Sequence, residues 1–412
     1  MPGPSRRIAI LLLALAAPLF AQSADLPQLL QRFERLAAAK DFAAAEVVAR
    51  DAASRFPASR DAKLALSNAL LWRAKYAEAQ RSFRELLVRN ANDREARLGL
   101  ANALYWSGDL RGAAREYGLV REHPEAARAL GEIRAAAAPL MRLDTMVRSD
   151  AQPLRSSMVE AGGSVFSDPL TRWDGTVGTW RFDTELPADD ASFARLGVET
   201  SFPHARLAFR ANATLMRFPD GETHPLGLIA ADRRIGRSTL SLTASRSALF
   251  GSATALDTHA YADSLELKWS RPNASARVES LRFFDDNRGL AADAWLLVPA
   301  GPLSVGGSLA FRDTFESRFV TTGVYDPYWT PIDLREARLI ATGSRRFEHA
   351  TAAIHADVGV ADEDLNGRYY PWRASLSLDV DLGRSTIRVE AGRQSTVFYT
   401  ANEFRATLAR GF

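Results

Sequence analysis

The chain has 412 residues, and its 52 lysines and arginines nearly balance its 49 aspartates and glutamates, which gives a formal net charge of +3. This balance argues against a nucleic-acid-binding protein, which needs a basic surface. Cysteine is absent, which excludes disulfides, thiolate metal sites, a cysteine nucleophile and the lipid-modified cysteine of a lipoprotein. The length predicts about two or three domains.

Residues 1–21 have the three-part layout of a secretory signal peptide. Arg6-Arg7 supply the positive start, Ile8 to Ala17 form an apolar run, and Ala21 is a small residue suited to cleavage. The apolar run is short for a membrane span, so a membrane anchor is the weaker alternative. No later stretch is apolar enough for a transmembrane helix, so we expect any further crossing to use strands.

Residues 25–139 have a helical period and an internal repeat. The segment Asn68 to Trp72 returns as Asn102 to Trp106, an offset of about 34 residues, which is the tetratricopeptide (TPR) period. This part resembles the TPR family, with about three repeats and a final helix ended by Pro139. A generic helical bundle is the alternative. TPR solenoids are binding scaffolds, so the resemblance implies docking of a partner.

Particular residues of this region have expected places in such repeats. Ala45, Ala79 and Ala113 recur where paired helices must pack closely. We expect Trp72 and Trp106 in the core between helices rather than at a ligand site.

Residues 140–412 alternate apolar and polar side chains, as strands with two unlike faces do. From Ala374 to Leu382 every second residue is apolar and the others are serine or aspartate, before a turn at Gly383-Arg384. No helical stretch follows that could cover an apolar face. The pattern predicts an antiparallel transmembrane β-barrel of about sixteen strands, an even number as bacterial barrels prefer.

The connections between the predicted strands fall into two sets. If residues 25–139 are periplasmic, the inner connections include Gly236-Arg237 and Pro272-Asn273, which are tight. The outer set includes Gly251 to His259 and Glu316 to Asp333, which are longer. Short periplasmic turns and longer outer loops are typical of outer-membrane barrels.

Aromatic residues gather near the predicted strand ends, where two interfacial belts are expected. The predicted outer belt consists of Phe218, Phe250, Phe283, Tyr328, Trp329, Tyr369, Tyr370, Trp372, Phe398 and Tyr399, and the inner belt of Phe202, Trp269, Phe347 and Phe412. The alternative is that these rings simply favour strand ends and cores.

The polar face of the strands predicts a hydrated lumen that carries charges of both signs. Its predicted pore-lining residues are Arg195, Glu199, Arg210, Glu266, Lys268, Arg277, Glu279, Arg338, Asp357, Arg373, Asp379, Asp381, Arg388 and Glu390. A sixteen-stranded ring is wide enough for an aqueous channel, which hydroxyl-rich substrates could use. The alternative is an interior filled by ion-paired side chains that conducts nothing.

The C-terminal residue, Phe412, follows Leu408, Ala406 and Phe404 on one strand face. This series resembles the terminal signal that the barrel-assembly machinery reads in outer-membrane proteins. The resemblance implies that Phe412 is an insertion signal.

Enzyme motifs are missing from the sequence. The six histidines are scattered, and no HExxH, Walker loop or GxSxG motif is present. Asp362 to Asp364 form an acidic stretch that is more typical of a solvated loop than of a calcium site. We therefore predict no enzyme activity, no cofactor, no metal and no nucleic-acid partner.

Signal peptide, TPR-like repeats and barrel together resemble outer-membrane components of exopolysaccharide secretion: the outer-membrane component of cellulose synthase, poly-N-acetylglucosamine porins and the smaller YaiO-like proteins. The residues that carry the resemblance are Arg97 to Ala101, Leu104 to Gly108 and Tyr325-Asp326-Pro327, the last similar to a Tyr-Phe-Ser-Pro stretch of the cellulose proteins. The small number of repeats favours the YaiO-like branch.

The resemblance implies a porin-like protein of the outer membrane that assists polysaccharide export. Its barrel would contact outer-membrane lipid, and its periplasmic TPR domain would dock a protein of a polysaccharide synthase complex or the polymer itself. One alternative is a barrel that only anchors a TPR interaction scaffold. A third is a barrel enzyme acting on lipid or glycan.

Overall fold

The computed structural model describes residues 25–150, 155–183, 189–250, 252–321, 323–397 and 400–412. The predicted signal peptide, residues 1–21, lies outside them. The chain divides into two compact units between Ile133 and Arg134, close to the predicted boundary at 139. Among the described residues, no helix is both long and apolar enough to cross a membrane.

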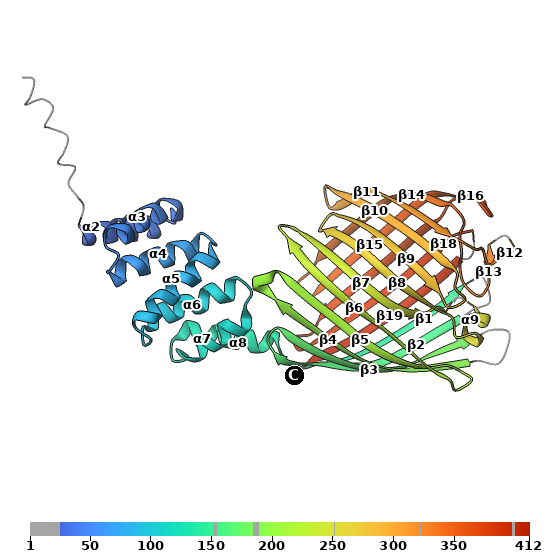
Figure 1. Cartoon of the computed structure of the whole chain (residues 1–412). Helices are drawn as coiled ribbons and strands as arrows, with labels where there is room; N and C mark the ends of the chain where they lie inside the picture. The colour runs from blue at the N-terminus through green and yellow to red at the C-terminus, as the bar shows by residue number, and fades with distance from the viewer. Residues whose placement is uncertain (1–24, 151–154, 184–188, 251, 322, 398–399) are drawn as a thin grey trace, which may run out of the picture. The chain divides into compact units, whose positions relative to one another are not determined.

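The N-terminal unit consists of helices arranged as successive antiparallel pairs (Figure 1). The helices are α2 (Leu26–Ala38), α3 (Phe42–Arg55), α4 (Arg60–Trp72), α5 (Tyr76–Arg89), α6 (Arg94–Trp106), α7 (Leu110–Gly118) and α8 (Pro124–Ala136). The first helices of the pairs start at Leu26, Arg60 and Arg94, a spacing of 34 residues that matches the predicted repeat. The helical region is confirmed, and its assignment to the TPR family stays a prediction.

Small residues let the paired helices approach closely. Ala45, Ala79 and Ala113 have no exposed surface. Gly99 faces the Phe83 ring, where an added Cβ would lie 2.3 Å from ring carbons. The core between the helices is therefore filled by alternating small and large side chains, as expected for stacked helix pairs.

The two tryptophans differ from each other in their packing. Trp106 is 64% exposed, so its prediction as a core residue is wrong. Trp72, 40% exposed, contacts Phe33 of α2 and Phe42 of α3, with 5.7 and 5.4 Å between ring centroids. Trp72 therefore packs between helices as predicted, although only in part. The same position in two repeats thus holds the same residue type with different burial.

Buried acidic side chains join successive helices of this unit. Asp93 caps α6 by accepting a hydrogen bond from the Ala96 N–H at 3.1 Å, and it accepts two more from Arg60 at 2.7 and 2.8 Å. The hydrogen bonds from Arg60 lower the pKa of the Asp93 carboxyl, since they favour its charged form. Arg60 thus ties α4 to the start of α6.

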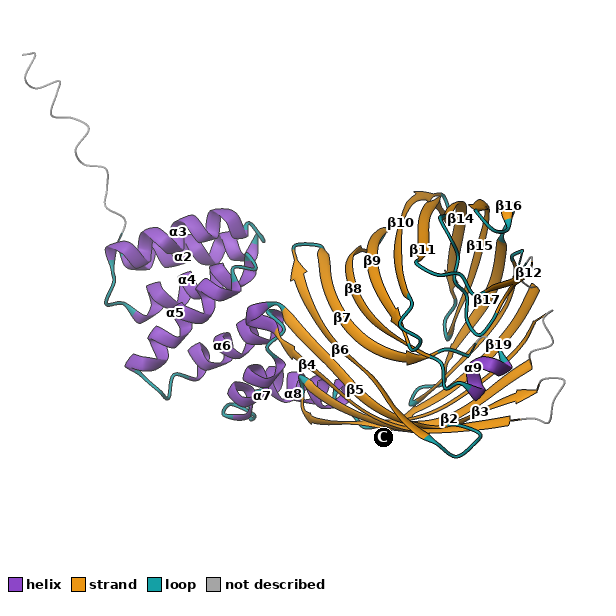
Figure 2. Cartoon of the chain, turned by 45° about the vertical axis from the view of Figure 1, so that its right-hand side comes forward, coloured by secondary structure: helices purple, strands orange, loops and turns teal. Residues whose placement is uncertain are grey.

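The C-terminal unit is a closed antiparallel barrel of sixteen strands (Figures 1 and 2). They are β1 (Leu140–Asp150), β2 (Arg155–Asp168), β3 (Thr171–Asp183), β4 (Asp189–Phe202), β5 (Leu207–Arg217), β6 (Thr223–Ile235), β7 (Ser238–Ala248), β8 (Tyr261–Arg271), β9 (Ala274–Phe283), β10 (Arg288–Ala300), β11 (Leu303–Thr314), β14 (Leu334–Arg346), β15 (Ala350–Glu363), β17 (Trp372–Asp381), β18 (Ser385–Ser395) and β19 (Thr400–Gly411). The short β16 (Gly367–Tyr369) pairs only with the end of β15, outside the ring. The predicted fold class is confirmed.

The first and last strands close the barrel on each other. β1 pairs with β19 along its whole length, from Leu140 opposite Gly411 to Asp150 opposite Ala401. The Phe412 N–H donates to the Pro139 carbonyl at 3.1 Å. Closure leaves the sheet without a free edge, which a strand structure in lipid requires.

The two ends of the barrel differ in their connections. At the end that holds Pro139 and Phe412, here called the terminal end, turns such as Gly236-Arg237 and Gly383-Arg384 join adjacent strands directly. Their glycines have φ of 61° and 79°, which suits a tight turn. The opposite end, here called the loop end, carries the longer segments 249–260 and 315–333. The predicted difference in loop length is present.

The outer wall of the barrel is apolar. Leu339, Ile229 and Leu376 are 72, 68 and 63% exposed, and they point away from the ion-paired side chains of the same strands. At the terminal end Phe202, Trp269, Phe347 and Phe412 are also exposed. Such a surface suits lipid, with rings at one interface.

Candidate functional site

The predicted pore-lining residues lie on the polar face of their strands. Arg195 lies two residues after the buried Phe193, on the same face of the strand, and directly before the exposed Leu196. Arg210 likewise directly follows the exposed Phe209. The same alternation places Glu199, Glu266, Lys268, Arg277, Glu279, Arg338, Asp357, Arg373, Asp379, Asp381, Arg388 and Glu390 opposite the apolar outer wall. That these side chains line a conducting path stays a prediction.

Cross-strand ion pairs hold many of these side chains in place. Asp357, with 1% of its side chain exposed, accepts hydrogen bonds from Arg338 and from Arg373, the latter at 3.0 Å. His355 Nε2 lies 2.8 Å from Asp357 Oδ2, the same oxygen that Arg373 contacts. The two arginines come from β14 and β17, the strands on either side of β15, and Asp357 stands directly opposite Arg373 in the register. The pairing fixes the long side chains against the wall.

A second cluster of ion pairs lies on the strands β8 to β10. Arg277 donates to Asp293 at 2.7 Å and to Glu266 at 3.4 Å, and Glu279 lies 3.7 Å away. One guanidinium here faces three carboxylates, and its opposite charge lowers the cost of removing them from bulk water. The lumen is thus mixed in sign.

Three cavities adjoin along the wall formed by β17, β18, β19 and β1. Their volumes are about 630, 360 and 700 Å³, from the loop end toward the terminal end. Glu403 lines the first two, Glu390 the last two, and Arg405 the first and third. Because they share lining residues, the cavities form a row along the lumen, and the first of them also reaches β3, β11 and β14 through Trp180, Arg312 and Arg338.

The cavity at the loop end combines aromatic rings with charged groups. Trp180, Phe250, Tyr328, Trp329 and Tyr369 line it. Arg312 lies over the Trp329 ring at 5.3 Å from its centroid. Flat apolar faces beside hydrogen-bonding groups are typical of ligand pockets.

Two long loops cover the loop end of the barrel. The segment between β7 and β8 contains the short helix α9 (Ala253–Asp257), which lies at this end of the barrel (Figure 2). Its Leu256 is 2% exposed and packs with Phe182, Phe193, Met216 and Phe218 of the lumen wall. The loop therefore folds onto the inner wall rather than away from it.

The second loop, between β11 and β14, contains β12 (Phe319–Thr321) and β13 (Val324–Tyr325) and is tied to the first. Ser252 and Thr254, at the start of α9, donate to the Asp326 carboxylate at 2.6 and 2.8 Å. The Tyr328 ring stacks on Phe283 with 4.3 Å between centroids. Burial raises the pKa of Tyr328, so its hydroxyl stays a donor. The mouth of the barrel is narrowed by two connected loops.

The predicted outer aromatic belt is wrong for several of its members. Phe218, Phe283, Tyr328 and Tyr369 are 2, 6, 4 and 8% exposed, because they pack inside the mouth. The alternation of the sequence indicates this burial for Phe218, because Phe218 and Arg210 are an even number of residues apart and Arg210 lies on the lumen face. Tyr370 and Trp372, 70 and 37% exposed, extend from the outer wall or its rim, whereas Trp329, 39% exposed, lines the cavity at the loop end. Phe398 and Tyr399 of the predicted belt lie outside the described residues.

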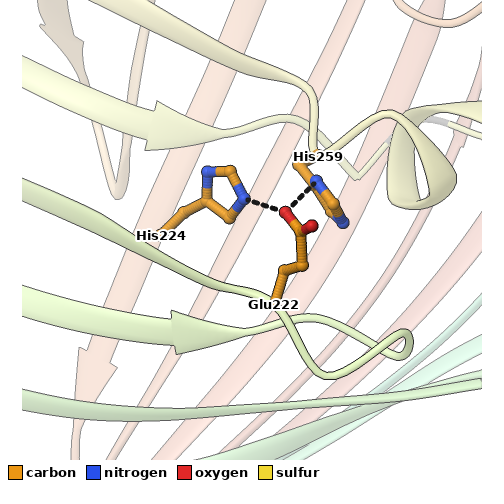
Figure 3. Close-up of side chains that lie close together, drawn as sticks. All are labelled: Glu222, His224 and His259. Carbon is orange, nitrogen blue, oxygen red and sulfur yellow. Dashed lines mark hydrogen bonds and ion pairs between the residues drawn. The ribbon is translucent and has the colours of Figure 1, made fainter.

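Another group that the sequence did not connect lies at the loop end (Figure 3). His224, at the start of β6, and His259, just after α9, have ring centroids 4.5 Å apart, and Glu222 lies between them. The backbone N–H of Glu222 and the nearby His259 lower the pKa of the Asp220 carboxyl beside them. The histidines are far apart in the sequence and meet only because the loop folds back.

The acidic stretch from Asp362 to Asp364 is not uniformly solvated as expected. Glu363, at the rim of the barrel, is 2% exposed and accepts a hydrogen bond from Tyr325, whereas Asp362 is exposed. Glu363 thus fastens the second loop to the end of β15.

Comparison with known proteins shows a shared fold and no family. No model of a known protein family matches the chain, and no curated protein matches it significantly. A solved structure described as a bacterial polysaccharide outer membrane secretin is 13% identical, with a TM-score of 0.53, over 67% of this chain and 99% of that one. This likeness shows the barrel fold alone.

Two further structures are looser matches. Pseudomonas aeruginosa OccK7 is 11% identical with a TM-score of 0.39, over 67% of this chain and 98% of its own. The translocator domain of the autotransporter NalP from Neisseria meningitidis is 12% identical with a TM-score of 0.29, over 72% and 98%. Scores this low carry no argument about this chain.

Proposed function

We propose that this protein is an outer-membrane channel through which a polysaccharide is exported, with its helical unit in the periplasm. The observation that carries the proposal is the row of three adjoining cavities along the β17–β19 wall. The likeness of the barrel to a polysaccharide outer membrane secretin supports it at the level of the fold. Under this proposal the chain is not an enzyme.

The chemistry of the lumen suits a sugar polymer. Sugars present apolar ring faces, which pack on aromatic side chains such as Trp329 and Trp180, and hydroxyl groups, which exchange hydrogen bonds with charged groups such as Arg405 and Glu403. Because the fourteen predicted pore-lining residues comprise seven cations and seven anions, the lumen would hold no large net charge of one sign that binds a charged polymer too tightly to release it.

The helical unit would dock a periplasmic protein of the synthase complex or the emerging polymer. Stacked helix pairs provide extended binding surfaces, and this unit leaves Trp106 exposed at the end of α6. The short turns at the terminal end match the periplasmic side of outer-membrane barrels.

Planar-bilayer recordings of the full-length protein test the channel. Arg373 and Arg388 have 50 and 59% of their side chains exposed in the lumen, so replacing both with glutamine should shift selectivity toward cations without setting a new anion against Asp357 or Asp379. Arg94→Gln with Arg115→Gln makes the same change of net charge on the helical unit, at side chains 80 and 76% exposed, and should leave selectivity unchanged.

Oligosaccharide block of the current tests the substrate class. Trp329→Ala should weaken block about 2- to 10-fold, the value of a lost aromatic contact of about 0.5–1.5 kcal/mol. Trp372→Ala is the matched control, because this ring has the same exposure but lies on the outer wall. If oligosaccharides block the current of both variants equally, the proposal that the channel carries a polysaccharide is wrong.

A second candidate function is an anchor for the helical unit. The connected loops over the mouth and the ion pairs around Asp357 favour it, because they narrow the lumen. Well-folded protein that shows no conductance in bilayers would favour this candidate.

A further inference from the structure

The histidine pair at the loop end has the donor atoms and the geometry of a metal site. Glu222 Oε2 lies 3.4 Å from His224 Nε2 and 3.6 Å from His259 Nδ1 (Figure 3). Each of the three side chains offers one ligand atom, and these atoms all lie within 4.8 Å of one another. Ligands on a tetrahedral zinc ion lie about 3.4 Å apart, so small rotations of the side chains suffice to bring them together.

The second ring nitrogen of His259 gives independent support. His259 Nε2 lies 2.8 Å from Asp220 Oδ2. An ionised carboxylate only accepts hydrogen bonds, so with an ion on Nδ1 the Nε2–H would donate to Asp220. A carboxylate on the outer nitrogen of a histidine is also the usual support of a metal-bound imidazole.

We propose that Glu222, His224 and His259 bind a divalent transition-metal ion of the zinc class, with Asp220 orienting His259. Two imidazoles and one carboxylate suit zinc, copper or nickel rather than calcium or magnesium, which prefer oxygen ligands only. The donor set leaves a fourth position for water. The exposed side chain of Glu222 is free to adjust to the ion.

The ion would fasten one loop of the mouth to the wall. Glu222 and His224 belong to the hairpin of β5 and β6, whereas His259 ends the segment that carries α9 and Leu256. Phe218 packs against His259, with 4.7 Å between ring centroids, so the site lies next to the apolar contacts of Leu256. Binding would therefore stabilise the inward position of the loop, since it requires both segments together.

Titration of the full-length, tag-free protein with zinc chloride after treatment with a chelator tests the proposal. We expect one bound ion per chain by calorimetry and by metal analysis. His224→Ala and His259→Ala should each weaken binding by at least about tenfold, and Asp220→Asn by about 10- to 100-fold. His349→Ala is the control, because this histidine is 75% exposed in a turn at the terminal end and should not change binding.

Folding of each variant is checked by its heat-modifiable migration, so that lost binding is not confused with a lost barrel. Cobalt added to the wild type should give the visible absorption of a tetrahedral site, and the His224→Ala, His259→Ala double variant should not. Equal zinc affinity of the wild type and this double variant, or no binding by the folded wild type, would overturn the proposal.

Discussion

Replacing Leu256 with alanine should release the α9 loop from the mouth of the barrel. Leu256 is 2% exposed and packs on Phe182, Phe193, Met216 and Phe218. Leucine-to-alanine changes in closed cores cost about 2–5 kcal/mol, and we expect the lower part of this range, about 2–3 kcal/mol, because water can enter the mouth and fill the space. The substitution should lower the free energy that holds the loop against the wall, and it should leave the pairing of the strands unchanged.

This free energy corresponds to a roughly 30- to 150-fold shift from docked to released loop, at about 1.4 kcal/mol for each factor of ten. Amide hydrogen exchange of residues 252–260 should rise by that factor, while exchange in the flanking strands β7 and β8 stays unchanged. Bilayer recordings should show larger open states more often if the loop narrows the path.

Leu242→Ala is the matched control, because Leu242 lies on the outer wall of β7 and is 50% exposed. It should alter neither the exchange of the loop nor the conductance. Unchanged exchange at residues 252–260 in the Leu256→Ala protein would refute the reasoning, since the apolar contact would then not hold the loop. Asp326→Ala, which removes the acceptor of Ser252 and Thr254, should add to the release.

Three further predictions concern assembly, acid stability and the outer wall. Deleting Phe412, which is 60% exposed, should reduce heat-modifiable barrel far more than Phe412→Tyr, and equal yields would contradict an insertion signal. In the isolated helical unit, Asp93→Ala should lower the free energy of unfolding by about 2 kcal/mol, because it removes the cap of α6 and the ion pair with Arg60. Asp41→Ala, which removes only an exposed cap, should lower it by about 1 kcal/mol, and denaturant-induced unfolding measures both. Since the Asp93 pKa is lowered by folding, its contribution is complete above its usual pKa and is lost as the pH falls through the lowered value; a pH-independent difference between wild type and variant would disprove this. Leu376→Arg should destabilise the barrel by about 2–4 kcal/mol near the membrane midplane, measured by urea-induced unfolding in lipid vesicles, and a cost near zero would place this residue elsewhere.

Local sequence patterns were enough to predict the repeating parts of this protein. The alternation from Ala374 to Leu382 defines which face of the strand is apolar, because successive side chains of a strand point to opposite sides whatever the surroundings. The recurrence of Asn68 to Trp72 at Asn102 to Trp106 likewise defines the spacing of the helix pairs. Both are local properties, so the strand number, the two faces and the helical third could be predicted.

The behaviour of the loops depends on contacts that exist only in the folded chain. Nothing in the order of residues says that Leu256 turns inward onto Phe218, or that His259 reaches His224. Such contacts depend on the path of segments without a period, and on which of several apolar surfaces a loop can reach once the barrel has closed. Trp106 is exposed for a related reason, since burial depends on the neighbour that covers a residue and not on the residue itself.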